Sequence, residues 1–159
     1  MRLRTGLVGL GKHGLRYARH IHADVPGLHL TAVCRRDRRI GEDVAREYGC
    51  DYVADARALA ERDDIDLIVV AAVPAVIEEV VALAAARKKR LLIEKPVAPD
   101  LRTGLRVLAE VERNGAYCAA GQTLRLKTVA REIARRMEDL GRLDSLIFSK
   151  RFPPQLDLE

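Results

Sequence analysis

The feature that most constrains this chain is a glycine pattern close to its start. Residues 9–14 read Gly-Leu-Gly-Lys-His-Gly and fit G-x-G-x-x-G, between an apolar stretch at residues 3–10 and a segment from Gly14 with helical spacing of apolar residues. In such a strand–turn–helix unit the first glycine allows a tight turn, the second lets the backbone approach a pyrophosphate, and the third permits close packing. The N-terminus of the helix offers free N–H groups to phosphates. The pattern therefore predicts a dinucleotide site that comprises Gly9, Leu10, Gly11, Lys12, His13 and Gly14. A purely structural turn, or a turn that binds FAD or S-adenosylmethionine, is an open alternative at this point.

Strand and helix signals alternate through the rest of residues 1–122. Short apolar or β-branched stretches predict strands at residues 28–34, 51–53, 66–71, 90–93 and 117–120. Helices are predicted between them, at residues 40–48, at 57–61, from Pro74, and after Asp100, which suits an N-cap. In the last of these helices we expect the inward-facing residues to be Leu101, Leu105 and Leu108. Strict alternation of this kind predicts an α/β fold with a doubly wound parallel sheet, the Rossmann fold.

The pattern changes after residue 122. A long helix is predicted from its apolar seam, which Gly141 would end, at Leu126, Val129, Ile133, Met137 and Leu140. Residues 142–152 then alternate like a strand of an antiparallel sheet with one wet face. We therefore expect an NAD(P)-binding domain at residues 1–122. Residues 123–159 would form a linking helix and the first strand of a second α/β domain that is largely absent.

The end of the second predicted strand indicates which cofactor binds. NAD sites and most S-adenosylmethionine sites carry a carboxylate there for the ribose hydroxyls. This chain instead has Arg35 and Arg36, about 21 residues past Gly14. Two guanidinium groups suit a 2′-phosphate, which favours NADP with NAD as the second choice. The alternative is that both arginines lie in a solvated loop and that Asp37 binds the ribose.

Composition excludes several other classes of protein. The net charge of +5 comes from basic residues interleaved with acidic ones, and aromatic residues make up only 4%, so we expect no nucleic-acid partner. The longest apolar run, residues 67–77, is too short to span a membrane, and the start of the chain does not continue as a signal peptide. Three widely spaced cysteines without a C-x-x-C pair predict reduced thiols, no metal site and a cytoplasmic location.

A second motif supports a family resemblance. Residues 91–96 read Leu-Leu-Ile-Glu-Lys-Pro and close the fifth predicted strand, and residues 119–126 read Ala-Ala-Gly-Gln-Thr-Leu-Arg-Leu. Together with the glycine turn, these segments resemble the N-terminal domain of the Gfo/Idh/MocA oxidoreductases, the family of glucose-fructose oxidoreductase and inositol dehydrogenase. The resemblance extends over nearly the whole chain.

The resemblance implies further site residues. Glu94 and Lys95 would lie beside the nicotinamide ribose, and Lys95 would be the catalytic residue that donates a proton to the substrate or positions it. A lysine near a bound cofactor can have a lowered pKa, which suits this role. The Lys95–Pro96 bond is a candidate cis peptide. The other implied cofactor contacts are Ala71, Ala72, Val73, Pro74 and Gln122. The alternative is that Glu94 and Lys95 form a surface ion pair.

The chain departs from the family pattern at two positions. Family members often have a histidine three residues after the proline that corresponds to Pro74. This chain has Ile77 at that position, which removes one polar contact. Arg125 matches an arginine of the family, but Leu126 replaces the aromatic residue after it.

The resemblance also implies an activity. We expect the cofactor half of an NADP-dependent oxidoreductase that transfers hydride to or from a carbonyl or hydroxyl carbon of a sugar, polyol or related small molecule. A full-length enzyme of this kind would form homo-oligomers through its second domain, which also supplies a catalytic histidine. No histidine follows His29 here, so we expect the 159-residue chain alone to be inactive. The alternative is a short nucleotide-binding sensor or scaffold module without catalysis.

Overall fold

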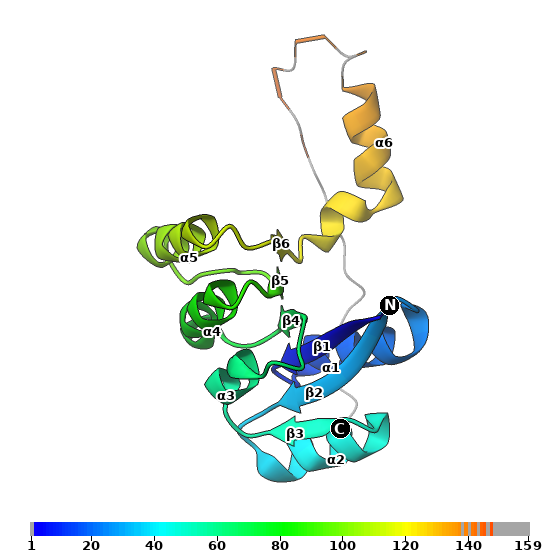
Figure 1. The fold of residues 1–159 in the computed structure, drawn as a ribbon. Helices are drawn as coiled ribbons and strands as arrows, with labels where there is room; N and C mark the ends of the chain where they lie inside the picture. Colours follow the sequence, from blue (N-terminus) through cyan, green and yellow to red (C-terminus); the bar gives the residue numbers. More distant parts are fainter. Residues whose placement is uncertain (1, 138, 140, 143, 146, 148–159) are drawn as a thin grey trace, which may run out of the picture. The chain divides into compact units, whose positions relative to one another are not determined.

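The computed structural model describes residues 2–137, 139, 141, 142, 144, 145 and 147, which belong to two compact units, Met1–Gln122 and Thr123–Glu159. The first unit contains a six-stranded parallel sheet with the order β3-β2-β1-β4-β5-β6 (Figure 1). Its strands are β1 (Leu3–Val8), β2 (Leu28–Cys34), β3 (Asp51–Val53), β4 (Leu67–Val70), β5 (Arg90–Ile93) and β6 (Cys118–Ala120). Every adjacent pair is parallel, which confirms the doubly wound α/β fold predicted from the alternation.

Helices connect the strands and cover both faces of the sheet. They are α1 (Lys12–Arg19), α2 (Arg38–Tyr48), α3 (Ala56–Glu61), α4 (Pro74–Ala86) and α5 (Leu101–Arg113). The predicted boundary signals are present: Gly49 ends α2 with a left-handed φ of 65°, and the Asp100 carboxylate caps α5 by accepting from the Thr103 N–H. A π-helical turn, η1 (His20–Asp24), continues α1, which the sequence pattern did not indicate. Among the described residues, no helix combines the length and the hydropathy that crossing a bilayer requires.

Two apolar cores lie on opposite faces of the sheet because neighbouring residues of a strand point in opposite directions. On β1, Leu7 packs with residues of α1 and α2 such as Ala18 and Val44. The next residue, Val8, belongs to the other core, which includes Val80 of α4. Strands buried on both faces need continuous apolar sequence, and each such side chain contributes about 1.5–3 kcal/mol when buried.

Helix α5 differs from the expectation in the face that it buries. The three predicted inward residues are exposed, with exposed fractions of 78% for Leu101, 56% for Leu105 and 50% for Leu108. Val107 is buried instead, and Val111, one turn later, packs against the same core. Helix α5 has two apolar stripes with helical spacing, one of leucines and one that contains Val107 and Val111. The prediction from periodicity alone selected the leucine stripe, which is the exposed one.

The second unit begins with a short 3-10 helix, η2 (Thr123–Leu126), which leads to α6 (Thr128–Arg136). The described residues of the predicted apolar seam are all exposed, from 40% for Ile133 to 76% for Leu126. Leu140 lies outside the described residues, and so does most of the strand predicted at residues 142–152. The second domain therefore stays a prediction.

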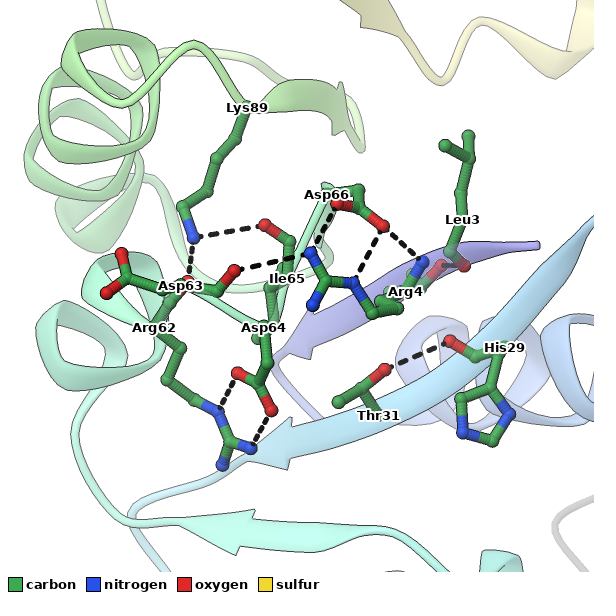
Figure 2. A network of polar contacts seen from close by, with 11 residues as sticks. Leu3, Arg4, His29, Thr31, Arg62, Asp63, Asp64, Ile65, Asp66 and Lys89 are labelled. Carbon is green, nitrogen blue, oxygen red and sulfur yellow. Dashed lines mark hydrogen bonds and ion pairs between the residues drawn. The ribbon is translucent and has the colours of Figure 1, made fainter. Parts of the chain in front are cut away.

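A polar network joins the amino ends of the first unit's central strands (Figure 2). The Arg4 guanidinium, at the start of β1, donates to both carboxylate oxygens of Asp66, at 2.8 and 3.0 Å, just before β4. Lys89 is 5% exposed, and its ammonium donates to the carbonyls of Arg62 and of Ile65, the latter at 3.1 Å. Burial lowers the pKa of Lys89. These contacts connect the amino edge of the sheet, opposite the edge that carries the predicted site.

Candidate functional site

The predicted site residues gather at the carboxyl edge of the sheet. The residues that leave its strands there are Gly9 after β1, Arg35 after β2, Ala71 after β4, Glu94 after β5 and Gly121 after β6. The neighbouring strands β1 and β4 are followed by α1 and α4, which contribute to opposite cores. In doubly wound sheets, ligands bind in the crevice that opens at such a point.

The three glycines of the turn have different surroundings. A Cβ at Gly9, whose φ is +94°, would lie 2.5 Å from the Ala71 carbonyl oxygen, and a Cβ at Gly14 would lie 1.9 Å from the Gly9 oxygen. The backbone therefore excludes any other residue at these two positions. A Cβ at Gly11 would have no atom within 4 Å. The free space over the second glycine is where the pattern predicts a pyrophosphate.

The start of α1 also fits a phosphate group. Gly11 is its N-cap and provides no side-chain cap, and the first turn contains no acidic residue. By contrast, the Asp37 carboxylate caps α2, and the Asp100 carboxylate caps α5. The first N–H groups of a helix lack partners within it and attract anions. The residues present, including the exposed Lys12 and His13, thus fit a pyrophosphate.

The end of β2 is joined to the glycine turn by Arg35. Its guanidinium donates to the Leu10 carbonyl, while its own carbonyl accepts from the Tyr52 hydroxyl at 2.9 Å. Arg36 is exposed. One oxygen of Asp37 accepts from the Ile40 N–H at 3.1 Å and caps α2. One oxygen of the carboxylate given as the alternative ribose ligand thus holds a helix end, and this cap involves only Oδ1.

The Glu94-Lys95-Pro96 segment continues from β5 with its backbone fixed. The Glu94 N–H donates to the Val70 carbonyl at 2.8 Å, and its carboxylate accepts from the Lys95 N–H at 2.6 Å. The other Glu94 oxygen lies 3.5 Å from Nδ1 of His13. Among the described residues, the Glu94 and Lys95 side chains form no ion pair with each other. The Lys95–Pro96 bond is cis, as predicted, and the Lys95 side chain is exposed.

The remaining predicted positions differ in their placement. Ala71 packs against Gly9, while Ala72, Val73 and Pro74 follow it into the first turn of α4. Gln122 is exposed at the end of the first unit. Ile77 is 1% exposed and belongs to the core, so this position of α4 does not face the site. Arg125 belongs to the second unit. Within the part of the chain that the structure describes, no cluster of three or more His, Cys, Asp or Glu residues could hold a metal ion.

Tyr17 and Gly121 are not among the predicted site residues, although Gly121 belongs to the 119–126 segment. A Cβ at Gly121 would lie 2.8 Å from Oε2 of Glu94 and 3.1 Å from the Tyr17 hydroxyl oxygen. Burial, and then the charge of Glu94, raises the pKa of Tyr17. Tyr17 stands four residues after His13, and this spacing places both on one face of α1. That spacing was the only sequence signal for Tyr17, while Gly121 already stood in the 119–126 segment that supports the family resemblance. The nearness of both residues to Glu94 depends on the fold, because it brings together residues far apart in the chain.

Residues 3–122 match a family model, GFO_IDH_MocA, described as "Oxidoreductase family, NAD-binding Rossmann fold". The chain is 26% identical over 151 residues to scyllo-inositol 2-dehydrogenase (NAD(+)) of Bacillus subtilis and 35% identical over 123 residues to inositol 2-dehydrogenase 4 of Saccharopolyspora erythraea. These alignments cover 94% and 77% of the chain. They cover only 44% and 35% of the relatives, so the chain spans less than half of their length.

Solved structures share the fold. One of them is the crystal structure of scyllo-inositol dehydrogenase from Lactobacillus casei with bound cofactor NAD(H) and scyllo-inositol. It superposes with a TM-score of 0.82 at 18% sequence identity, over 87% of this chain and 42% of that one. At this identity the likeness shows a common fold and carries no substrate or cofactor assignment.

Proposed function

Because the chain belongs to the GFO_IDH_MocA family of oxidoreductases with an NAD-binding Rossmann fold, we propose that it is the cofactor-binding part of a nicotinamide-dependent oxidoreductase. The reaction is hydride transfer to or from a carbonyl or hydroxyl carbon of a small molecule. A sugar, a polyol or a related compound is the proposed substrate class. The relatives named as inositol dehydrogenases support a polyol.

One observation carries this proposal. The open space over Gly11, the uncapped start of α1 and the Glu94-Lys95 segment all lie at the same edge of one parallel sheet. A dinucleotide needs such an edge, because its pyrophosphate must reach the helix while its two halves extend over strands on either side. Here β2 and its arginines lie on one side of β1, and β4 and β5 on the other.

The proposed cofactor is NADP, with NAD as the second choice. Arg35 and Arg36 stand where NAD sites carry an acid, and Arg36 is exposed. Its planar donors suit a 2′-phosphate. Asp37, the acid that could have replaced them, caps α2. Because one relative is named as an NAD(+) enzyme, a binding experiment must compare NADPH with NADH.

Lys95 is the proposed catalytic residue. A bound nicotinamide cofactor supplies or accepts the hydride. The role of Lys95 is to exchange a proton with the substrate oxygen at Nζ: its ammonium donates the proton when a carbonyl is reduced, and its neutral amine accepts the hydroxyl proton when an alcohol is oxidised. Glu94 holds the backbone N–H of Lys95, which keeps the segment in place while the Lys95 side chain extends into solvent.

The organisation of the whole protein forms a further part of the proposal. Residues 1–122 are the cofactor domain, and residues 123–159 form a linking helix and the start of a second domain for substrate binding and homo-oligomer formation. The chain's coverage of less than half of its relatives supports this. We place the protein in the cytoplasm, which agrees with its three free cysteines.

Titration of the purified chain with NADPH and with NADH, followed by cofactor fluorescence, tests the proposal. We expect NADPH to bind more tightly than NADH. A clear preference for NADH would contradict the assignment of Arg35 and Arg36 to a 2′-phosphate, and binding of neither cofactor would contradict the proposed function.

A further inference from the structure

Two hydrogen bonds hold Glu94 at the site. Its backbone N–H is bonded to β4, through the Val70 carbonyl, and the following residue donates its own N–H to the Glu94 carboxylate. The side chain is only 11% exposed although it lies at the open edge of the sheet. A buried carboxylate needs partners, because its removal from water is otherwise costly. Besides the Lys95 N–H, the polar side chains near this carboxylate come from α1.

Helix α1 supplies two of these neighbours. His13 Nδ1 lies 3.5 Å from one Glu94 oxygen. The other oxygen, Oε2, and the Tyr17 hydroxyl both surround the point where a Cβ on Gly121 would lie, at 2.8 and 3.1 Å. His13 and Tyr17 are four residues apart on one face of α1, so a single helix carries both polar groups toward Glu94.

The absence of a side chain at Gly121 makes this approach possible. Gly121 is buried, and its N–H donates to the Ile93 carbonyl at 2.7 Å, which fixes it beside the residue that precedes Glu94. Its φ does not lie in the left-handed region, so backbone conformation does not require glycine here. The requirement is steric: a methyl group would occupy the space that Glu94 and Tyr17 share.

We propose that His13 and Tyr17 are positioning residues that hold the Glu94 carboxylate against α1, in the space left free by Gly121. This inference rests on the proposed function. The helix that receives the pyrophosphate at its N-terminus thereby also fixes the Glu94-Lys95-Pro96 segment, which faces the nicotinamide half of the cofactor. The adenosine half, on the other side of β1, depends on Arg35 and Arg36 and not on this contact.

The test compares two ligands that share the adenosine half. NADPH spans both sides of β1, whereas adenosine 2′,5′-bisphosphate reaches only the side of β2. We expect Tyr17→Phe to weaken NADPH binding by about three- to tenfold, because it removes the polar group that α1 places near the Glu94 carboxylate, and Gly121→Ala to weaken it more. Binding of adenosine 2′,5′-bisphosphate should stay within about twofold in both variants, which a general loss of structure would not allow. If the wild type prefers NADH, the same comparison uses NADH and ADP.

Matched controls separate the possible outcomes. Tyr117→Phe removes a hydroxyl from a side chain that is 70% exposed, and Gly27→Ala adds a methyl group in open space, so neither should change either affinity. Equal weakening of both ligands, or no change in NADPH binding by Tyr17→Phe, would overturn the proposal. Should Gly121→Ala not fold, as judged by loss of a cooperative thermal transition, Tyr17→Phe alone decides. Failure of the wild type to bind any of these nucleotides would instead refute the proposed function.

Discussion

The guanidinium of Arg35 donates a hydrogen bond to the backbone carbonyl of Leu10, so the residue that leaves β2 supports the glycine turn that leaves β1. Its neighbour Arg36 is exposed. Adjacent arginines of the same motif therefore have different surroundings. Arg35 is bonded to the glycine turn, whereas Arg36 is exposed and accessible to a ligand.

This difference predicts separable effects of the two arginines. Arg36→Ala should weaken NADPH binding by about 10- to 100-fold, the value of a charge-assisted contact, and leave NADH binding within about twofold. Arg35→Ala should weaken both cofactors, because the turn loses a support that either one needs. Fluorescence titrations of both variants measure this. Arg102→Ala, an exposed arginine on α5, is the control. An equal loss of NADPH and NADH affinity in Arg36→Ala would contradict the 2′-phosphate assignment.

The space over the second glycine predicts a loss of binding without a loss of stability. A methyl group in Gly11→Ala meets no protein atom but occupies the approach to the pyrophosphate. We expect NADPH affinity to fall at least about tenfold while the free energy of unfolding changes by less than about 1 kcal/mol. Calorimetry and urea unfolding measure the two quantities. Gly27→Ala, which also adds a methyl group in open space, should change neither. Unchanged affinity in Gly11→Ala would mean that the pyrophosphate binds elsewhere.

Removal of the proposed proton donor should affect turnover far more than binding. In the full-length enzyme that we propose, Lys95→Ala should lower kcat by about 10²- to 10⁴-fold, the usual contribution of a general acid or base. Cofactor affinity should change by less than about threefold, because the Glu94 contacts that fix the segment involve the backbone N–H of residue 95 and not its side chain. Steady-state kinetics and a cofactor titration measure both quantities. The opposite pattern, with affinity lost and kcat retained, would make Lys95 a binding residue.

The Arg4–Asp66 pair predicts a part of the pH dependence of stability. The Arg4 side chain and backbone N–H lower the pKa of Asp66 to about 2, below the value of about 3.9 in an unfolded chain. A lowered pKa stabilises the folded state above the unfolded pKa, and this contribution is lost as the pH falls from about 5 to about 2. Urea unfolding at several pH values should therefore show a shallower decline for Asp66→Asn than for the wild type. An identical decline in both proteins would show that the pair does not contribute.

Helix α5 offers a direct test of which of its stripes is buried. Val107→Ala should lower the free energy of unfolding by about 2 kcal/mol, because two buried methyl groups are lost and a small cavity forms. Leu105→Ala removes more carbon but from a side chain that is 56% exposed, so its effect should stay within about 0.5 kcal/mol. The two variants are each other's control in the same urea unfolding experiment. A larger effect of Leu105→Ala than of Val107→Ala would indicate that the leucine stripe of α5 is buried in the protein in solution.

Local patterns predicted much of the first unit. The strands at residues 28–34, 51–53 and 90–93 have the predicted bounds, and Gly49, Pro74 and Asp100 mark helix ends as expected. These features depend on a few neighbouring residues, on β-branched runs, on a left-handed glycine or on a cap. The glycine turn and the cis Lys95–Pro96 bond were likewise visible in short motifs.

The sequence by itself therefore determined the α/β alternation, the parallel sheet, the glycine turn and the identity of the residues that leave each strand. Only the tertiary structure decided which stripe of α5 is buried, and that Arg35 supports Leu10 while Asp37 caps α2. It also brought Tyr17 and Gly121 to Glu94. Periodicity records where apolar residues recur along one element, but burial and polar contacts depend on what the neighbouring elements present. Which residues become buried or bonded is decided when strands distant in the chain pair in the sheet and bring their carboxyl ends to one edge.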